Sequence, residues 1–262
     1  MSGPARVRHV EQTMGTVFSF DVRGGTDSEQ VRAALEESVA LLHRTDETFS
    51  PYRPESQVTR LNRGELTLAR CDPRVRQVWR LCAEAERESG GWFSARYARR
   101  PGGGCGFDPT GLVKGWAVEQ AARLLALADA VCVNGGGDIQ LRGGPWRIGI
   151  SDPLEPGALA AVVGVADGAR ETAVATSGPA ERGCLIVDPH TGEPPVTALA
   201  SVTVVCPGLT RADARATAAY AMGDGAREWL EELPDTEGFA VALDGSRWYT
   251  SGFGRYATAV RA

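Results

Sequence analysis

The chain has one lysine and three histidines among its 262 residues, and these shortages limit the chemistry that it can carry. Three histidines cannot build a histidine-rich metal centre, so a metal site would need oxygen ligands, which favours Mg²⁺ or Ca²⁺. The six cysteines are widely scattered without a CxxC pair, and this spacing suits neither a zinc site nor a small disulfide scaffold. We therefore expect mostly buried free thiols. The signatures GxxxxGK[ST], GxGxxG, GxSxG and HExxH are also absent.

Long apolar runs are missing as well. No stretch approaches the roughly 20 apolar residues of a membrane helix, and residues 1–12 lack the apolar segment of a signal peptide. We therefore expect a cytoplasmic protein without a membrane partner. The net charge of −5 argues against nucleic-acid binding.

The residues that are present predict helices early in the chain and short strands late. Apolar residues at helical spacing indicate helices at 27–43, 72–91, 114–127 and 210–223, whereas the polar stretch 45–62 should begin as a loop. This order favours an α+β fold of mixed or antiparallel sheets with flanking helices. We expect one compact domain over 1–262, with or without two lobes, in which 1–11 form a short N-terminal extension. Strands are expected at 16–22, 131–141, 146–152, 159–165, 172–177, 184–189, 201–206, 238–245 and 247–253.

The only lysine, Lys114, lies in FDPTGLVKGWAVEQ between Gly111 and Gly115, whereas the other basic residues are all arginines. Gly111 leaves the backbone open to close approach by a ligand, and a helix that begins near a capping Thr110 would attract anions with its N–H groups. A lysine in the first turn runs against the helix dipole, and a bound phosphate would offset that cost. A solvated lysine at an ordinary loop-to-helix junction is the alternative.

The segment TRADARATAAYAMG places Asp213 and Thr217 four residues apart, on one face of the expected helix. A carboxylate and a hydroxyl there form part of a Mg²⁺ site. The alternative is a capping box between Thr210 and Asp213, with Thr217 bonded back to a helix carbonyl.

Two further segments are ambiguous. VNGGGDIQLRGG is either a glycine-rich hairpin or a place where backbone approaches a flat ligand. ATSGPAERGCLIVDPHTGEP reads as two strands that lead into a polar DPHTG loop rich in turn-forming residues.

The lysine segment and the ADARAT segment, together with six further blocks in the same order along the chain, resemble the ApbE family, the FAD:protein FMN transferases. The resemblance extends across nearly the whole chain. The lysine segment is similar to the family pattern D-x-x-x-I-A-K-G, and ADARAT is similar to A-D-x-x-x-T. The resemblance implies an ApbE-like, T-fold-like domain. The matching blocks are MGT (14–16), SPYRPESQVTRLN (50–62), GGWF (90–93), DPTGLVKGWAVE (108–119), NGGGDI (134–139), ATSG (175–178), DPHTG (188–192) and SVTV…ADARAT (201–217).

The resemblance also implies Mg²⁺-dependent transfer of FMN from FAD to a threonine hydroxyl of an acceptor protein, with release of AMP. Mg²⁺ would be held by the Gly111 carbonyl, the Asp213 carboxylate and the Thr217 hydroxyl, and Asp213 would also be catalytic. A compact lysine ammonium would balance the pyrophosphate charge beside the ion, where the broad fork of arginine would crowd it. The positions that match FAD contacts are Met14, Tyr52, Trp92, Phe93, Ser94, Asp108, Lys114 and Val187.

Three positions depart from the family pattern. Ser94 stands where the family commonly has Asp, Leu185 where it has the histidine of H-I-I-D-P, and Val113 where it has Ala. If that histidine is the general base, His190 is the nearest replacement. FAD binding without catalysis is therefore one alternative function. FAD hydrolysis to FMN and AMP is another, because it needs the same Mg²⁺ and pyrophosphate site as transfer. No S-G-A-T-like acceptor motif occurs in the chain, so we do not expect self-modification.

Overall fold

The computed structural model describes residues 6–25, 28–96, 98–99, 105–166, 171–179 and 186–256. Its centre is an eight-stranded sheet in the order β1-β2-β5-β6-β9-β10-β11-β12, and all of its neighbouring strands are antiparallel. These strands are β1 (Arg6–Thr13), β2 (Thr16–Arg23), β5 (Ala130–Gly135), β6 (Asp138–Arg142), β9 (Thr172–Ser177), β10 (Leu199–Cys206), β11 (Glu237–Ala242) and β12 (Arg247–Tyr249). Two-stranded sheets are formed by β3 (Ala98–Arg99) with β4 (Cys105–Gly106) and by β7 (Trp146–Ser151) with β8 (Leu159–Val165).

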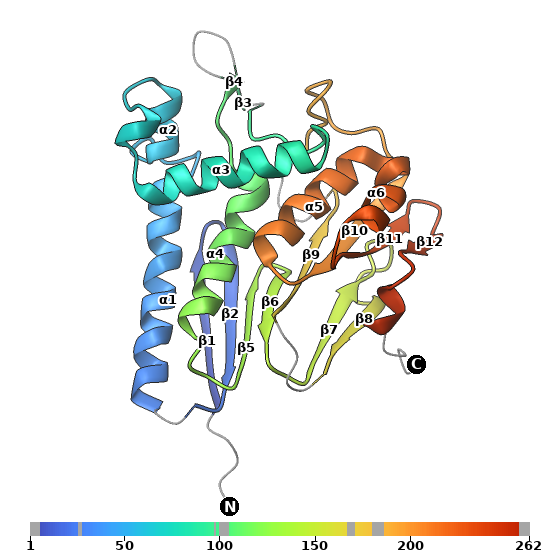
Figure 1. The fold of residues 1–262 in the computed structure, drawn as a ribbon, viewed down its shortest axis with the longest axis horizontal. Helices are drawn as coiled ribbons and strands as arrows, with labels where there is room; N and C mark the ends of the chain where they lie inside the picture. Colours follow the sequence, from blue (N-terminus) through green and yellow to red (C-terminus); the bar gives the residue numbers. More distant parts are fainter. Residues whose placement is uncertain are drawn as a thin grey trace, which may run out of the picture.

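Helices cover one face of the large sheet (Figure 1). Helix α4 lies between α1 and α5, and α3 crosses near the ends of all three at the upper edge in this view. The helices are α1 (Ser28–Phe49), α2 (Gln57–Asn62), α3 (Pro73–Glu88), α4 (Thr110–Leu124), α5 (Leu209–Met222) and α6 (Ala226–Glu232). None of these described helices is long and apolar enough to cross a membrane.

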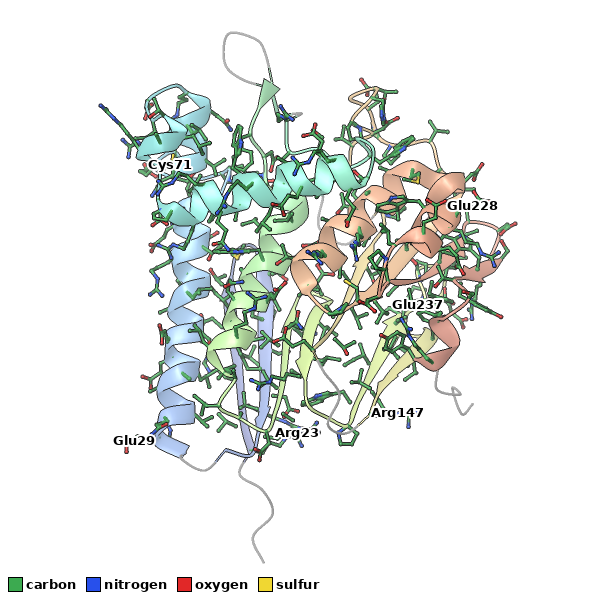
Figure 2. All side chains as sticks on the ribbon, in the orientation of Figure 1. Arg23, Glu29, Cys71, Arg147, Glu228 and Glu237 are labelled. Atoms are coloured by element: carbon green, nitrogen blue, oxygen red, sulfur yellow. The ribbon has the colours of Figure 1, made fainter. Side chains whose placement is uncertain are left out.

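Two hydrophobic clusters lie on the two faces of the sheet, and Figure 2 shows the side chains that fill both layers. Val202 and Val204 of β10 belong to the larger cluster, under the helices, whereas Val205 belongs to the smaller one, with the β7–β8 hairpin. Successive residues of a strand point to opposite faces, which explains why β10 is buried along its whole length.

The α+β fold and the four expected helices are confirmed, with shifts in the boundaries. Helix α1 continues through the start of the expected loop as far as Phe49, because that side chain is buried and its ring packs 5.8 Å from the ring of Trp116. The segment 131–141 is a hairpin of β5 and β6, and residues 186–189 form no strand. Residues 6–11 of the expected N-terminal extension lie in β1.

The prediction of buried free thiols is confirmed for Cys71, Cys82 and Cys206. Cys132 is also a free thiol, and its burial raises the pKa of the thiol to about 12. The side chains of Cys105 and Cys184 lie outside the described part of the structure.

Candidate active site

The start of α4 is fixed by the residues that precede it. Asn62 of α2 holds the backbone of Phe107 with two hydrogen bonds of 2.8 Å, one to its N–H and one to its carbonyl. The Asp108 carboxylate then accepts the N–H of Thr110, the first residue of the helix, at 3.0 Å. Asp108, rather than the expected Thr110, therefore supplies the side chain that satisfies a helix N–H, and Lys114 lies one turn into the helix.

Helices α4 and α5 run antiparallel and contact each other at positions about one turn apart. Near the start of α5, the Glu119 carboxylate accepts the N–H of Thr210 at 2.8 Å. One turn along, the N–H of Gly115 donates to Asp213 Oδ2 at 2.9 Å. A further turn along, the Thr217 hydroxyl lies 3.5 Å from the carbonyl oxygen of Gly111.

Gly115 allows this close approach of the helices. A Cβ atom at this position would lie only 2.7 Å from the Leu209 carbonyl oxygen and 2.7 Å from the Asp213 Cβ. Any larger residue would push α5 away from α4, and Asp213 with it.

The helix pair therefore brings together Gly111, Asp213 and Thr217, the three residues that the family resemblance groups. This arrangement also excludes the capping-box alternative, because side chains other than that of Asp213 accept the first N–H groups of α5. Glu119 accepts the N–H of Thr210, Gln140 accepts that of Leu209 at 2.8 Å, and Asp213 faces α4 instead.

These three residues offer a carboxylate, a hydroxyl and a backbone carbonyl, which are the hard oxygen donors that suit Mg²⁺. The described residues contain no group of three His, Cys, Asp or Glu side chains that could hold a metal ion. A cation here would thus rely on one carboxylate and neutral oxygens, with the remaining coordination left to water or substrate phosphates.

Lys114 forms an ion pair with Asp138, the first residue of β6. Asp138 is only 2% exposed, and its Oδ1 also accepts the N–H of Thr176 at 3.1 Å. The sequence does not single out this aspartate, because an acidic residue after three glycines is also typical of an ordinary turn.

Two tight turns lie side by side at the same end of the sheet. Met14 and Gly15 form the β1–β2 turn with positive φ angles of 50° and 66°, and Gly136 and Gly137 form the β5–β6 turn. The N–H of Gly136 donates to the Val17 carbonyl at 3.0 Å, which joins the two turns. The glycines thus bring backbone, rather than side chains, to the surface beside Asp138.

The segment after α3 contributes an aromatic pair with different exposures. Phe93 is buried and lies next to Gly111, and its N–H donates to Ser89 Oγ at 2.9 Å. Trp92 is only partly buried. Ser94 Oγ accepts the N–H of Arg96 at 3.2 Å, so this serine is used within its own turn.

His190 connects this aromatic segment to the DPHTG loop. Its imidazole lies edge-on to the Trp92 ring at 4.5 Å, and its Nδ1 is 3.1 Å from Asp188 Oδ1. Desolvation raises the pKa of Asp188, but hydrogen bonds from the backbone and imidazole of His190 outweigh it and leave the pKa below its usual value. The His190 side chain is half-exposed and therefore accessible.

Two other predicted FAD-contacting residues, Tyr52 and Val187, lie in loops outside the α4–α5 contact. Tyr52 is 89% exposed in the loop between α1 and α2, so the structure does not pack it against the α4–α5 contact. Val187 is partly buried in the segment just before Asp188. Leu185, at the family histidine position, lies outside the described residues.

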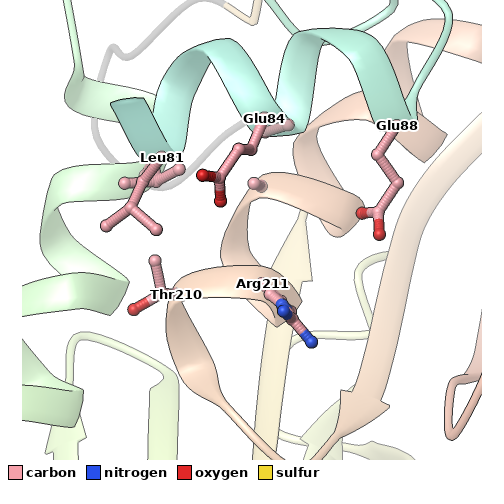
Figure 3. Close-up of a pocket in the computed structure, with 8 residues that line it drawn as sticks. Leu81, Glu84, Glu88, Thr210 and Arg211 are labelled. Carbon is pink, nitrogen blue, oxygen red and sulfur yellow. The ribbon is translucent and has the colours of Figure 1, made fainter. Parts of the chain in front are cut away.

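A separate pocket lies between α3, α4 and α5 (Figure 3). Its labelled residues are Leu81, Glu84 and Glu88 from α3 and Thr210 and Arg211 from α5, and no predicted site residue lines it. The candidate site is therefore the α4–α5 contact and the neighbouring end of the sheet, where the β1–β2 and β5–β6 turns lie, and not this pocket.

The fold and this geometry define an α+β protein with an oxygen-donor site between two helices and a lysine–aspartate pair beside it. The sequence model of the ApbE family matches residues 14–99 and 94–240, and the chain belongs to this family.

Solved structures share the fold of this chain. The flavin transferase ApbE from Vibrio cholerae superposes with a TM-score of 0.78 at 21% identity, and the match covers 97% of this chain and 99% of that one. The ApbE protein from Thermotoga maritima superposes with a TM-score of 0.82 at 19% identity, covering 97% of this chain and 100% of that one. A curated relative from Haemophilus influenzae, named FAD:protein FMN transferase, is 31% identical over 134 residues. That match spans 45% of this chain and 38% of the relative.

Proposed function

We propose that this protein transfers FMN from FAD to a threonine hydroxyl of an acceptor protein in a Mg²⁺-dependent reaction that releases AMP. The observation that carries this proposal is the meeting of Gly111, Asp213 and Thr217 across the α4–α5 contact, where Asp213 binds the backbone N–H of the residue that follows Lys114. The name of the H. influenzae relative, FAD:protein FMN transferase, supports the transfer of FMN from FAD to a protein.

In this proposal, the Gly111 carbonyl, the Asp213 carboxylate and the Thr217 hydroxyl hold Mg²⁺. The ion would neutralise negative charge on the FAD pyrophosphate when bound. Lys114 adds a positive charge near Gly111, since it lies three residues further along α4.

The flavin and adenosine would contact residues from several elements around this centre. The backbone of the Met14–Gly15 turn lies at the end of the sheet, and Trp92 and Phe93 offer aromatic surface next to Gly111. The remaining proposed contacts are Tyr52, Ser94, Asp108 and Val187.

His190 is our candidate for the base that accepts the proton of the threonine hydroxyl. With Nδ1 directed at Asp188, the other ring nitrogen, Nε2, is left to take up a proton. The hydroxyl oxygen then bonds to the FMN phosphorus, the pyrophosphate bond breaks, and AMP leaves with the bridging oxygen.

FAD hydrolysis is the second candidate, with water in place of the threonine. It needs the same Mg²⁺ and pyrophosphate site as transfer. The departures at Ser94 and Leu185 bear instead on FAD binding without turnover, because each removes a group that the family commonly has. FAD binding without turnover is the third, although a binder has little need of the Asp213–Thr217 pair. A cytoplasmic location and a cytoplasmic acceptor stay predictions.

The test is chromatography of the purified protein after incubation with FAD and Mg²⁺ or with EDTA, in each case with and without a threonine-containing acceptor fragment. AMP matched by covalent flavin on the acceptor would establish transfer. AMP matched by free FMN would establish hydrolysis, and FAD binding without any AMP would mean that the protein is a binder.

A further inference from the structure

Asp138 is one of the most deeply buried carboxylates in the described part of the chain. A buried charge is stable only when it is paired and hydrogen-bonded, because the interior cannot solvate it as water does. Asp138 meets this requirement with both oxygens: Oδ1 accepts the N–H of Thr176, and Oδ2 contacts the Lys114 ammonium.

The two members of this ion pair differ sharply in exposure. The Asp138 side chain is 3% exposed, whereas the Lys114 side chain is 25% exposed. The pair thus has a fixed anionic end inside the protein and a cationic end that reaches the surface. This ion pair restricts the lysine side chain to few of the rotamers that its flexible stem would otherwise sample.

Carboxylates hold α4 from two sides at consecutive residues. Asp138 on the sheet contacts the Lys114 side chain, and Asp213 on α5 accepts the N–H of Gly115. The lysine is therefore locked at a defined position relative to the proposed Mg²⁺ donors, through both its side chain and the backbone that carries it.

We propose that Asp138 is a positioning residue that holds the Lys114 ammonium beside the proposed metal donors, where it meets a phosphate of the dinucleotide. This inference rests on the proposed function for the identity of the phosphate group. Asp138 does not touch the reacting atoms and acts through Lys114.

The same geometry accounts for lysine in a chain that otherwise uses arginine. One oxygen of Asp138 is engaged by a backbone N–H, so a single oxygen remains for the cation. A lysine ammonium is a compact point charge that can pair with a single carboxylate oxygen, whereas the planar fork of arginine is best matched by two. Arginine at position 114 would lose the anchor even though it keeps the charge.

Because Lys114 is the only lysine, the pair can be observed directly. Protein labelled with ¹³C,¹⁵N-lysine gives one lysine side-chain NMR signal, free of overlap. We expect that signal to differ from that of a solvated lysine in the wild type and to move to the solvated position in Asp138→Asn. Asparagine keeps the shape and can still accept the Thr176 N–H, but it removes the counter-charge.

The matched control is Glu237→Gln. Glu237 is a buried carboxylate in β11 that pairs with Arg255 at 3.0 Å and accepts the Thr250 hydroxyl, and it lies away from α4 (Figure 2). This variant should leave the Lys114 signal unchanged. A Lys114 signal that is the same in Asp138→Asn and in the wild type overturns the proposal, whether or not the protein turns FAD over.

Phosphate recognition is tested by adding ADP with Mg²⁺ as the probe. The Lys114 signal of the wild type should shift, and the shift should be lost or much reduced in Asp138→Asn. A full shift in Asp138→Asn would contradict the positioning role.

The kinetic readout asks whether Asp138 acts through Lys114. For AMP release, Asp138→Asn should lower kcat by about 10- to 100-fold, with a smaller change in KM, and should cause no further loss in a Lys114→Met background. Multiplied losses in the double variant would overturn the proposal.

Lys114→Arg should lose as much kcat as Lys114→Met. Full activity of Lys114→Arg would also overturn the proposal, even if Asp138→Asn does not fold. Absence of AMP from the wild type would refute the proposed function alone, since the NMR arms do not depend on turnover.

Discussion

Asp213 has two parts in the candidate site, because its carboxylate accepts the Gly115 N–H and is the charged donor of the proposed Mg²⁺ site. Asp213→Asn keeps an oxygen for the N–H but removes the charge. We expect metal-dependent AMP release to fall by about 100-fold or more, with the helical circular dichroism retained. Chromatographic AMP assays with titrated Mg²⁺ provide the measurement.

Asp244→Asn is the matched control for this prediction. Asp244 also accepts a backbone N–H, that of Ser246 at 2.9 Å, but it lies in the exposed β11–β12 turn. It should keep wild-type turnover. Unchanged turnover in Asp213→Asn itself would remove Asp213 from the metal site.

Residue chemistry alone drew attention to Lys114, Asp213 and Thr217, through a unique lysine and a helical carboxylate–hydroxyl pair, but left a structural alternative for each. Their proposed roles came from the family resemblance. Residue chemistry could not assign Asp138. The role of this residue depends on β6 lying under α4, which brings together positions that are 24 residues apart. A carboxylate that follows a glycine turn looks the same in sequence whether it is solvated or buried.

At the scale of elements, the α4–α5 contact is the feature on which the site depends, and Gly115 sets its distance. Gly115→Ala places a Cβ atom against backbone and the Asp213 side chain, so one of the two helices must move. We expect a loss of about 1–3 kcal/mol in the free energy of unfolding, together with a loss of metal-dependent activity. Urea denaturation followed by circular dichroism measures the first effect.

Gly254→Ala is the comparison, because Gly254 lies in a short 3₁₀ helix where an added Cβ meets nothing within 4 Å. It should be close to neutral. Equal stability of the two alanine variants would show that α4 and α5 are not in tight contact.

An ion pair between Arg215 and Glu88 also holds α5 against α3. The buried Arg215 guanidinium donates to both oxygens of Glu88, at 3.0 and 2.7 Å, and these hydrogen bonds lower the pKa of Glu88 below 4.5. A lowered carboxylate pKa stabilises the fold above the unfolded value, and this contribution is lost as the pH falls through the folded value. Glu88→Gln should therefore cost about 1–2 kcal/mol near pH 7, after allowance for the partial exposure of Glu88, and progressively less below about pH 4.5.

Denaturant titrations of wild type and variant at several pH values provide this measurement. Glu86→Gln, on the same helix, removes a more exposed pair with Arg96 and should cost much less. A stability difference for Glu88→Gln that persists unchanged at pH 3 would contradict the ion-pair explanation.

The helices were predictable because their apolar faces repeat at helical spacing, as Val75, Val78 and Cys82 do in α3. The boundaries were not, because tertiary packing decides them: Phe49 extends α1 by contact with Trp116. β1 also escaped prediction. It is an edge strand with no fully buried position, so its sequence lacks the apolar alternation that made β2 recognisable.

For the whole molecule, the large sheet carries the helices of the candidate site on one face and the β7–β8 hairpin on the other. Strand β10 belongs to both hydrophobic layers, since the fully buried Val204 and Val205 point to opposite faces. A shared central strand couples the layers. This coupling predicts one cooperative unit, in answer to the question of two lobes that the sequence left open.

Val204→Ala and Val205→Ala test that prediction from the two sides of the sheet. Each variant removes about two buried methylene equivalents and leaves a cavity, so each should lower the free energy of unfolding by about 2 kcal/mol. If the layers form one unit, both variants shift the same single urea transition, whether it is followed by tryptophan fluorescence or by circular dichroism. If they are separate lobes, Val205→Ala would displace only part of the transition and leave the unfolding of the helical layer, with metal-dependent AMP release, at its wild-type midpoint.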